Sequence, residues 1–195
     1  MTGTTKVKVP ETTTPRFLQQ ANEIILQMSQ YSGAELGHML KLNPKLSAEV
    51  YRRFQDFHSE DIAAIPSLLA YTGIVFQKIN PKDFTIDDFL YAQEHMRFSS
   101  ACYGLVRPLD MIKPYRMEFD LSLPELGEGN MFDFWRPRIT DLLIQEVKAG
   151  DNILINVASS EIQSSFYWKQ VKKEVRVITP DFKVWKNGKL KTIVI

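Results

Sequence analysis

The chain has 195 residues, 44% of them hydrophobic and 24% charged, and its formal net charge of +1 gives no whole-protein field that would attract a polyanion. A single cysteine excludes an internal disulfide and any metal site built from several cysteines. No apolar run approaches the ~18 residues of a membrane span, which predicts a protein outside the membrane and, by default, in the cytoplasm.

The N-terminal part of the chain predicts helices. Residues 1–13 are rich in threonine, which predicts a flexible lead-in before a single domain at residues 14–195. Thr14 and Pro15 have the residue types of an N-cap and a first helical position, and apolar residues follow at helical spacing as far as Met28. A capping box at residues 32–35 and the proline at position 44 begin two further helices.

Strand signals begin further along the chain. Residues 65–70 are apolar and run into a Tyr-Thr-Gly loop, which predicts a short strand. A helix capped at Thr85 follows, and then a second apolar run at residues 99–106. Strand, helix and strand in this order predict a crossover unit. The loops after the two strands would then share one sheet edge, where ligands of open α/β folds bind.

The C-terminal part predicts one long helix and more strands. Residues 133–149 have helical periodicity and are followed by Gly150 as a stop. Residues 153–157 are typical of a buried strand, and residues 183–195 predict a hairpin that turns at Asn187-Gly188. The expected fold class is therefore mixed α/β (α+β), with a central mixed sheet, helices packed around it, an N-terminal helical segment and a C-terminal β-hairpin.

The loop after the second predicted strand concentrates positive charge. Arg107, Lys113 and Arg116 lie in a stretch whose direction is fixed by Pro108 and Pro114. Because proline restricts the unfolded chain, cations in such a loop are held at a lower entropic cost than on a free loop. The loop is therefore a candidate phosphate site.

Two tyrosines of the same stretch, Tyr103 and Tyr115, could supply stacking faces for nucleic-acid bases. The alternative is that the arginines pair with Asp110 and Glu118 and that the tyrosines belong to the core. Both interpretations stay open at the level of the sequence.

A second candidate site follows the strand at residues 153–157. Asn156, Ser159, Ser160 and Glu161 come just past its end, where free backbone N–H groups and serine hydroxyls would make an anion pocket. The same residues would equally serve as an ordinary helix cap.

The last 30 residues are locally basic, with eight Lys and Arg against two Asp and Glu. Lys169, Lys172 and Lys173 could follow a nucleic-acid backbone, although many lysines at alternate strand positions mark only a solvated sheet face.

Signals for other chemistry are weak. The three histidines have no metal-ligand spacing, so no metal and no cofactor is expected. Cys102 lies in an apolar run and is typical of a buried small hydrophobe; peroxide sensing would require exposure and a lowered pKa. No phosphate loop, catalytic triad or paired-carboxylate motif supports an enzyme.

The motif order around the central loop resembles the signature of the bacterial YaaA family, which is associated with resistance to peroxide stress. The resemblance covers roughly residues 17–195. It is carried by Arg97, Ser100, Tyr103-Gly104, Arg107 to Asp110 and Lys113 to Glu118, and by the outlying stretches Tyr71 to Gly73, Phe134-Trp135 and Ile155 to Ser159 with Glu161.

The chain departs from the family pattern at several places. Ala101-Cys102 replaces the usual Gly-Leu, and Ser160 and Ile162 replace the usual Asp and Tyr. The family's opening strand and its closing basic helix are not found, so the chain is expected to be a truncated member.

The resemblance implies a cytosolic protein of the response to hydrogen peroxide that limits iron-dependent oxidative damage to DNA and binds duplex or branched DNA. The alternative is an enzyme that acts on a nucleotide or a small phosphorylated ligand in the same cleft. The oligomeric state is left open. The expected anion or nucleic-acid site comprises Arg97, Tyr103, Arg107, Lys113, Tyr115, Arg116, Asn156, Ser159, Glu161, Lys169, Lys172 and Lys173.

Overall fold

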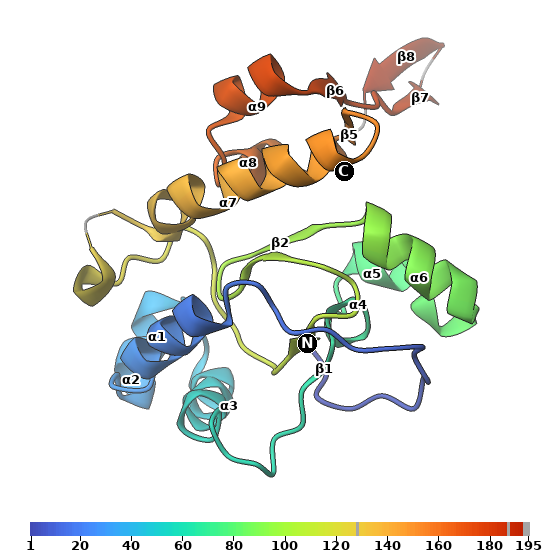
Figure 1. The fold of residues 1–195 in the computed structure, drawn as a ribbon. Helices are drawn as coiled ribbons and strands as arrows, with labels where there is room; N and C mark the ends of the chain where they lie inside the picture. Colours follow the sequence, from blue (N-terminus) through green and yellow to red (C-terminus); the bar gives the residue numbers. More distant parts are fainter. Residues whose placement is uncertain (128, 187, 193–195) are drawn as a thin grey trace. The chain divides into compact units, whose positions relative to one another are not determined.

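The computed structural model describes residues 1–127, 129–186 and 188–192, and the chain divides into two compact units, Met1–Met131 and Phe132–Ile195 (Figure 1). Unit 1 holds the N-terminal helices and the central loop, and unit 2 holds the C-terminal elements. That residues 14–195 fold as a single domain stays a prediction.

Unit 1 begins with the three expected helices, α1 (Leu18–Met28), α2 (Gly33–Met39) and α3 (Pro44–Gln55). The capping box is present, because the Ser32 side chain accepts a bond from the Glu35 N–H and the Glu35 carboxylate accepts one from the Ser32 N–H. The first helix begins later than its cap signal predicted, after Phe17 rather than Thr14, and without a side-chain cap.

The strand predicted at residues 65–70 is mostly wrong. Only β1 (Ile65–Pro66) is extended, and the next four residues form α4 (Ser67–Ala70). Contacts distant in sequence decide this, since the Ser67 hydroxyl donates to the carbonyl of Arg107 and its N–H donates to that of Asp110. Strand β1 pairs antiparallel with β4 (Met111–Ile112).

The apolar run at residues 99–106 is a hairpin rather than one strand. Strand β2 (Phe98–Ser100) pairs antiparallel with β3 (Gly104–Val106). Gly104 has a φ of 71° at the turn, and the Ser100 hydroxyl accepts a bond from the Tyr103 N–H. The crossover unit expected here is therefore wrong. Between the hairpin and α4 lie α5 (Ile74–Ile79), a 3₁₀ turn (Pro81–Asp83) and α6 (Ile86–His95), which has the expected Thr85 cap.

The segment expected as a flexible lead-in contacts the core of unit 1. Val7 and Val9 pack against a buried cluster that contains Leu68, Phe89 and Leu109. Near its end, Thr13 forms an isolated parallel bridge with Asp110. Residues 1–13 therefore cover part of the core.

Unit 2 contains α7 (Met131–Ala149) except its first residue, together with β5 (Ile153–Ile155), α8 (Ser160–Gln163), α9 (Trp168–Glu174) and β6 (Arg176–Ile178). Strands β5 and β6 pair in parallel, with Ile153 opposite Arg176, and α8 and α9 form the connection between them. The expected strand after α7 is present but less buried than predicted, since Ile155 is exposed.

The C-terminal hairpin is confirmed, with β7 (Lys183–Lys186) antiparallel to β8 (Lys189–Thr192). Its predicted turn residue Asn187 lies outside the described residues.

The fold class is mixed α/β, as expected. In place of one central sheet, the strands of the described residues pair two by two in separate sheets: β1 with β4, β2 with β3, β5 with β6, and β7 with β8. A 3₁₀ turn (Pro124–Leu126) lies in the segment before α7.

Candidate nucleic-acid interface

In the central loop, the side chain of Arg107 forms hydrogen bonds within the protein. Arg107 donates from Nε and Nη2 to Oδ1 of Asp110, at 3.1 and 2.7 Å, and from Nη2 to the carbonyl of Thr14 at 3.1 Å. Asp110 is fully buried and also accepts bonds from the Thr13 hydroxyl and the Arg107 N–H. The ion pair weighed as the alternative for Arg107 is therefore present.

Two further candidate cations of unit 1 also bond to backbone carbonyls. Lys113 donates from Nζ to the carbonyls of Phe57 and Ser59, at 2.8 and 2.9 Å. Arg97 donates from Nη1 to carbonyls at the C-terminal end of α6, among them those of Gln93 and Met96 at 2.9 and 2.7 Å. Both side chains satisfy carbonyl groups that would otherwise need water.

Arg116 differs from these three cations. Its side chain is 48% exposed, and Nη2 lies 3.4 Å from the Glu118 carboxylate, which is itself exposed. An exposed ion pair of this kind holds the guanidinium weakly. Arg116 is therefore the candidate cation of the central loop that has the most freedom to meet a ligand.

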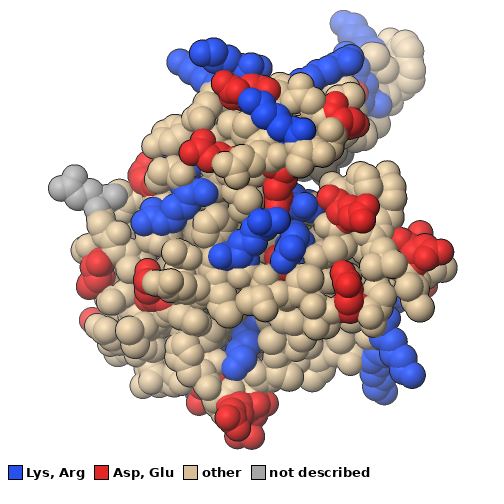
Figure 2. Space-filling model, viewed as in Figure 1, with Lys and Arg blue, Asp and Glu red and all other residues tan. Residues whose placement is uncertain are grey.

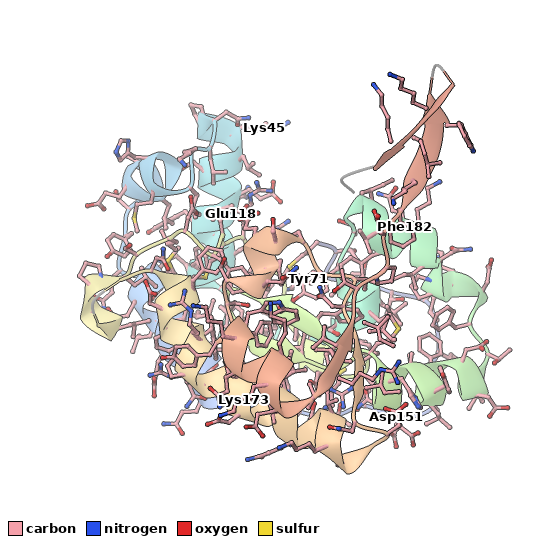
Figure 3. The ribbon with its side chains drawn as sticks, turned by 90° about the horizontal axis from the view of Figure 1, so that it is seen from above. Lys45, Tyr71, Glu118, Asp151, Lys173 and Phe182 are labelled. Carbon is pink, nitrogen blue, oxygen red and sulfur yellow. The ribbon has the colours of Figure 1, made fainter. Side chains whose placement is uncertain are left out.

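The two candidate stacking tyrosines lie in the core of unit 1, where Tyr103 is 1% exposed and Tyr115 is 8% exposed. The Tyr115 hydroxyl lies 2.8 Å from the Ser100 hydroxyl and 3.2 Å from that of Tyr71, which is labelled in Figure 3. Burial raises the pKa of Tyr71 to about 12 and also raises the pKa values of Tyr103 and Tyr115. Neither candidate ring offers an open face to a base.

Cys102 is fully buried next to this tyrosine network. Burial raises the pKa of its thiol well above the ordinary value, which disfavours the thiolate that peroxide attacks. Its environment is that of a structural cysteine.

The second candidate site has the geometry of a helix cap. The Ser159 hydroxyl accepts a bond from the Ile162 N–H at 3.3 Å at the start of α8. Asn156 is buried, donates from Nδ2 to the Thr179 hydroxyl at 3.3 Å and accepts a bond from the Ala158 N–H. Glu161 is exposed. Arg116 belongs to unit 1 and these residues to unit 2, so a cleft that joins them stays a prediction.

Helix α9 presents its lysines together. Lys169, Lys172 and Lys173, here called the α9 lysine stripe, are all exposed, and their spacing of three and four residues places them on one helix face. Val171 and Val175 are buried on the other side. Among the described residues, no salt bridge joins the stripe to a carboxylate, and the neighbouring Glu174 pairs with Lys148.

The surroundings of the stripe are also basic. By sequence, unit 2 carries eleven Lys and Arg against seven Asp and Glu. In Figure 2, Lys and Arg side chains gather over the part of unit 2 that holds α9 and the β7–β8 hairpin. Figure 3 labels Lys173 on this helix. Arg176, Lys189 and Lys191 are exposed members of the same unit.

A shallow depression of about 520 Å³ opens on the surface of unit 2 beside the stripe. Two of its residues, Ser160 and Lys169, were candidate ligand contacts from the sequence, whereas its aromatic residues and its arginine were overlooked. The run of three aromatic residues directly before Lys169 was the signal that could have found it. The depression is lined by Arg136, Ser160, Gln163, Ser164, Phe166, Tyr167, Trp168 and Lys169.

Within the part of the chain that the structure describes, no three His, Cys, Asp or Glu side chains form a group that could hold a metal ion. Over the same residues, none of the helices combines the length and the apolar character needed to cross a bilayer.

These features define a mixed α/β protein with an exposed basic surface in its C-terminal unit. The family model described as "Peroxide stress protein YaaA" matches residues 1–195, and the chain belongs to this family. The resemblance expected from the motifs is confirmed.

Relatives align with all or nearly all of the chain. A UPF0246 protein of Parabacteroides distasonis is 63% identical over all 195 residues, which cover 77% of that protein. A UPF0246 protein of Bacteroides thetaiotaomicron is 56% identical over the same 195 residues, or 76% of its length. One from Crocosphaera subtropica is 36% identical over 191 residues, or 96% of this chain and 74% of the relative.

Proposed function

We propose that this peroxide stress family member binds DNA, and that it limits iron-dependent oxidative damage by occupying the DNA in the cytoplasm. The observation that carries the proposal is the α9 lysine stripe, three exposed lysines on one helix face. Lysine at a protein surface contacts phosphate oxygens and releases counterions, which supplies most of the affinity of non-specific DNA binding.

The comparison with the central loop favours the stripe as the contact surface. Arg107 and Lys113 donate hydrogen bonds to Asp110 and to backbone carbonyls. A phosphate would have to compete with those bonds. The stripe has no such internal partner among the described residues, so its charge is available to a ligand.

The alternative of an enzyme acting on a nucleotide or small phosphorylated ligand draws less support. It depended on the loop cations acting together with Asn156 to Glu161. Asn156 and Ser159 bond to neighbouring backbone and side-chain groups, and the depression of unit 2 is open rather than enclosed. We therefore keep DNA binding as the leading proposal.

The test is fluorescence anisotropy of a labelled duplex and a four-way junction over a range of salt. The variant Lys169→Gln/Lys172→Gln/Lys173→Gln removes the stripe. We expect it to weaken duplex binding at least tenfold and to lower the slope of log K against log salt by about 2 to 3, since each phosphate contact contributes roughly 0.9.

A matched control removes the same charge from unit 1. Lys45, Lys78 and Lys82 are exposed, and the triple glutamine variant at these positions should bind as the wild type does. If both triple variants lose duplex affinity equally, the loss comes from the lower net charge of the protein and not from the stripe itself. Wild-type affinity in the stripe variant would overturn the proposal.

A further inference from the structure

We propose that the depression in unit 2 is a nucleotide site, in which Tyr167 stacks on an unpaired base while Lys169 and Arg136 contact the adjoining phosphate. The proposal rests on the DNA binding proposed above and adds a second kind of contact to it. It predicts that the protein prefers DNA with an unpaired nucleotide to a perfect duplex.

The backbone that carries the aromatic surface of the site is anchored. Tyr167 is 47% exposed, between the buried Phe166 and the partly buried Trp168. Its backbone N–H donates to the hydroxyl of the fully buried Thr140 at 3.0 Å, which anchors the start of α9 to α7. An exposed ring on an anchored backbone is the arrangement that proteins use to stack single-stranded bases, at about 1–3 kcal/mol per base.

The charge around this ring is positive. Arg136 lies with its guanidinium carbon 5.9 Å from the Tyr167 ring centroid, held by a bond from Nε to the Ser164 carbonyl and one from Nη1 to Asp133, each 2.9 Å long. Asp133 offsets part of this charge, so the exposed Lys169 is the stronger contact for a phosphate. None of the residues that line the depression is Asp or Glu.

The remaining lining suits the edge of a base. Ser160 and Gln163 bring a hydroxyl and an amide, which donate and accept hydrogen bonds without adding charge. The depression, of about 520 Å³, is open, so a base can enter it while still attached to its strand. A nucleotide site needs an aromatic surface for the base, cations for the phosphate and neutral polar groups for the edge of the base. The depression has all three.

Lys169 links this site to the DNA surface, since it belongs both to the depression and to the α9 lysine stripe. A strand whose phosphates follow the stripe therefore brings a neighbouring base to Tyr167. In a perfect duplex that base is paired and stacked, and extruding it costs a few kcal/mol. An unpaired base in a bulge enters without that cost.

The test compares two probes, a labelled hairpin duplex and the same duplex with one unpaired thymidine at its centre. The wild-type chain should bind the bulged probe about tenfold more tightly. Tyr167→Leu should abolish the preference and leave duplex affinity unchanged, whereas Tyr167→Phe should retain it. Tyr91→Leu is the matched control, because Tyr91 is an exposed tyrosine of unit 1.

Free thymidine monophosphate distinguishes the two sources of the ligand. If free thymidine monophosphate displaces the bulged probe but not the perfect duplex, the depression also binds free nucleotides. If it displaces neither probe while the bulged probe is still preferred, the depression binds only nucleotides that belong to a strand. Both results support the site.

Equal binding of the two probes by the wild type would overturn the inference, as would a bulge preference that survives Tyr167→Leu. The DNA-binding proposal is tested by a different result. It predicts that the stripe variant loses affinity for the perfect duplex, whether or not the wild type prefers the bulged probe. Circular dichroism of each variant confirms that it is folded.

Discussion

The guanidinium of Arg107 and the carboxylate of Asp110 form a two-bond ion pair in which the carboxylate is fully buried and the arginine side chain is 21% exposed. This pair joins the central loop to residues 13 and 14 of the chain, because Asp110 also binds the Thr13 hydroxyl and Arg107 also binds the Thr14 carbonyl. Its geometry indicates a structural role.

We therefore expect Arg107→Ala to lower the free energy of unfolding by about 3 kcal/mol, since it leaves a buried carboxylate without its charge partner. Arg116→Ala, which breaks an exposed pair, should cost less than about 1 kcal/mol. Urea unfolding of the two variants measures the difference. A variant of Arg107 that is as stable as the wild type but loses DNA affinity would instead place Arg107 at the binding surface.

The buried tyrosine network should also contribute to the free energy of unfolding. Tyr115→Phe deletes the hydroxyl that bonds to Ser100 and Tyr71, so each of those two hydroxyls loses one hydrogen-bond partner in the core. We expect a loss of about 1–3 kcal/mol in thermal or urea unfolding. Tyr91→Phe should change stability by less than about 0.5 kcal/mol, because Tyr91 is exposed.

Stability should fall at alkaline pH. Burial raises the pKa of Tyr71 from 10 to about 12 in the folded protein. The unfolded chain therefore loses this proton above pH 10 while the folded chain keeps it, so the contribution is complete below pH 10 and is lost as the pH rises towards 12. Urea midpoints between pH 8 and pH 11.5 measure the decline. A profile that stays flat across this window would contradict the assignment.

Cys102 should react slowly in the folded protein. Its thiol is fully buried and its pKa is raised by that burial, so few thiolates exist near pH 8. Labelling with a thiol reagent should be slow in buffer and fast in concentrated urea at the same pH. Fast labelling of the folded chain, or a sulfenic acid formed there by hydrogen peroxide, would restore a sensing role for Cys102.

The elements that could be predicted are those decided by neighbouring residues. The caps at Ser32 and Thr85 bond within three residues of themselves, so their sequence signals suffice. The four residues of α4 could not be predicted, because the Ser67 hydroxyl bonds to a carbonyl 40 positions away. The β2–β3 hairpin depends on the positive φ of Gly104, which an apolar run conceals.

In the candidate site, too, the sequence could not reveal contacts that join residues distant in the chain. The sequence singled out Lys169, Lys172 and Lys173 as basic residues, but the helix that brings them onto one face was not predicted. Nothing near Lys113 in the sequence indicated that the carbonyls of Phe57 and Ser59 would bind its ammonium group. The sequence therefore identified which cations are present, and tertiary structure decided which of them remain available to a ligand.

The lysine stripe and Tyr167 both lie on the connection between β5 and β6. The parallel register of these strands, with Ile153 opposite Arg176, is set by backbone pairing and not by the outward side chains of the connection. Mutations on the outer face of α9 can therefore accumulate without disturbing the scaffold. We expect this connection to be the segment through which members of the family evolve different ligand preferences.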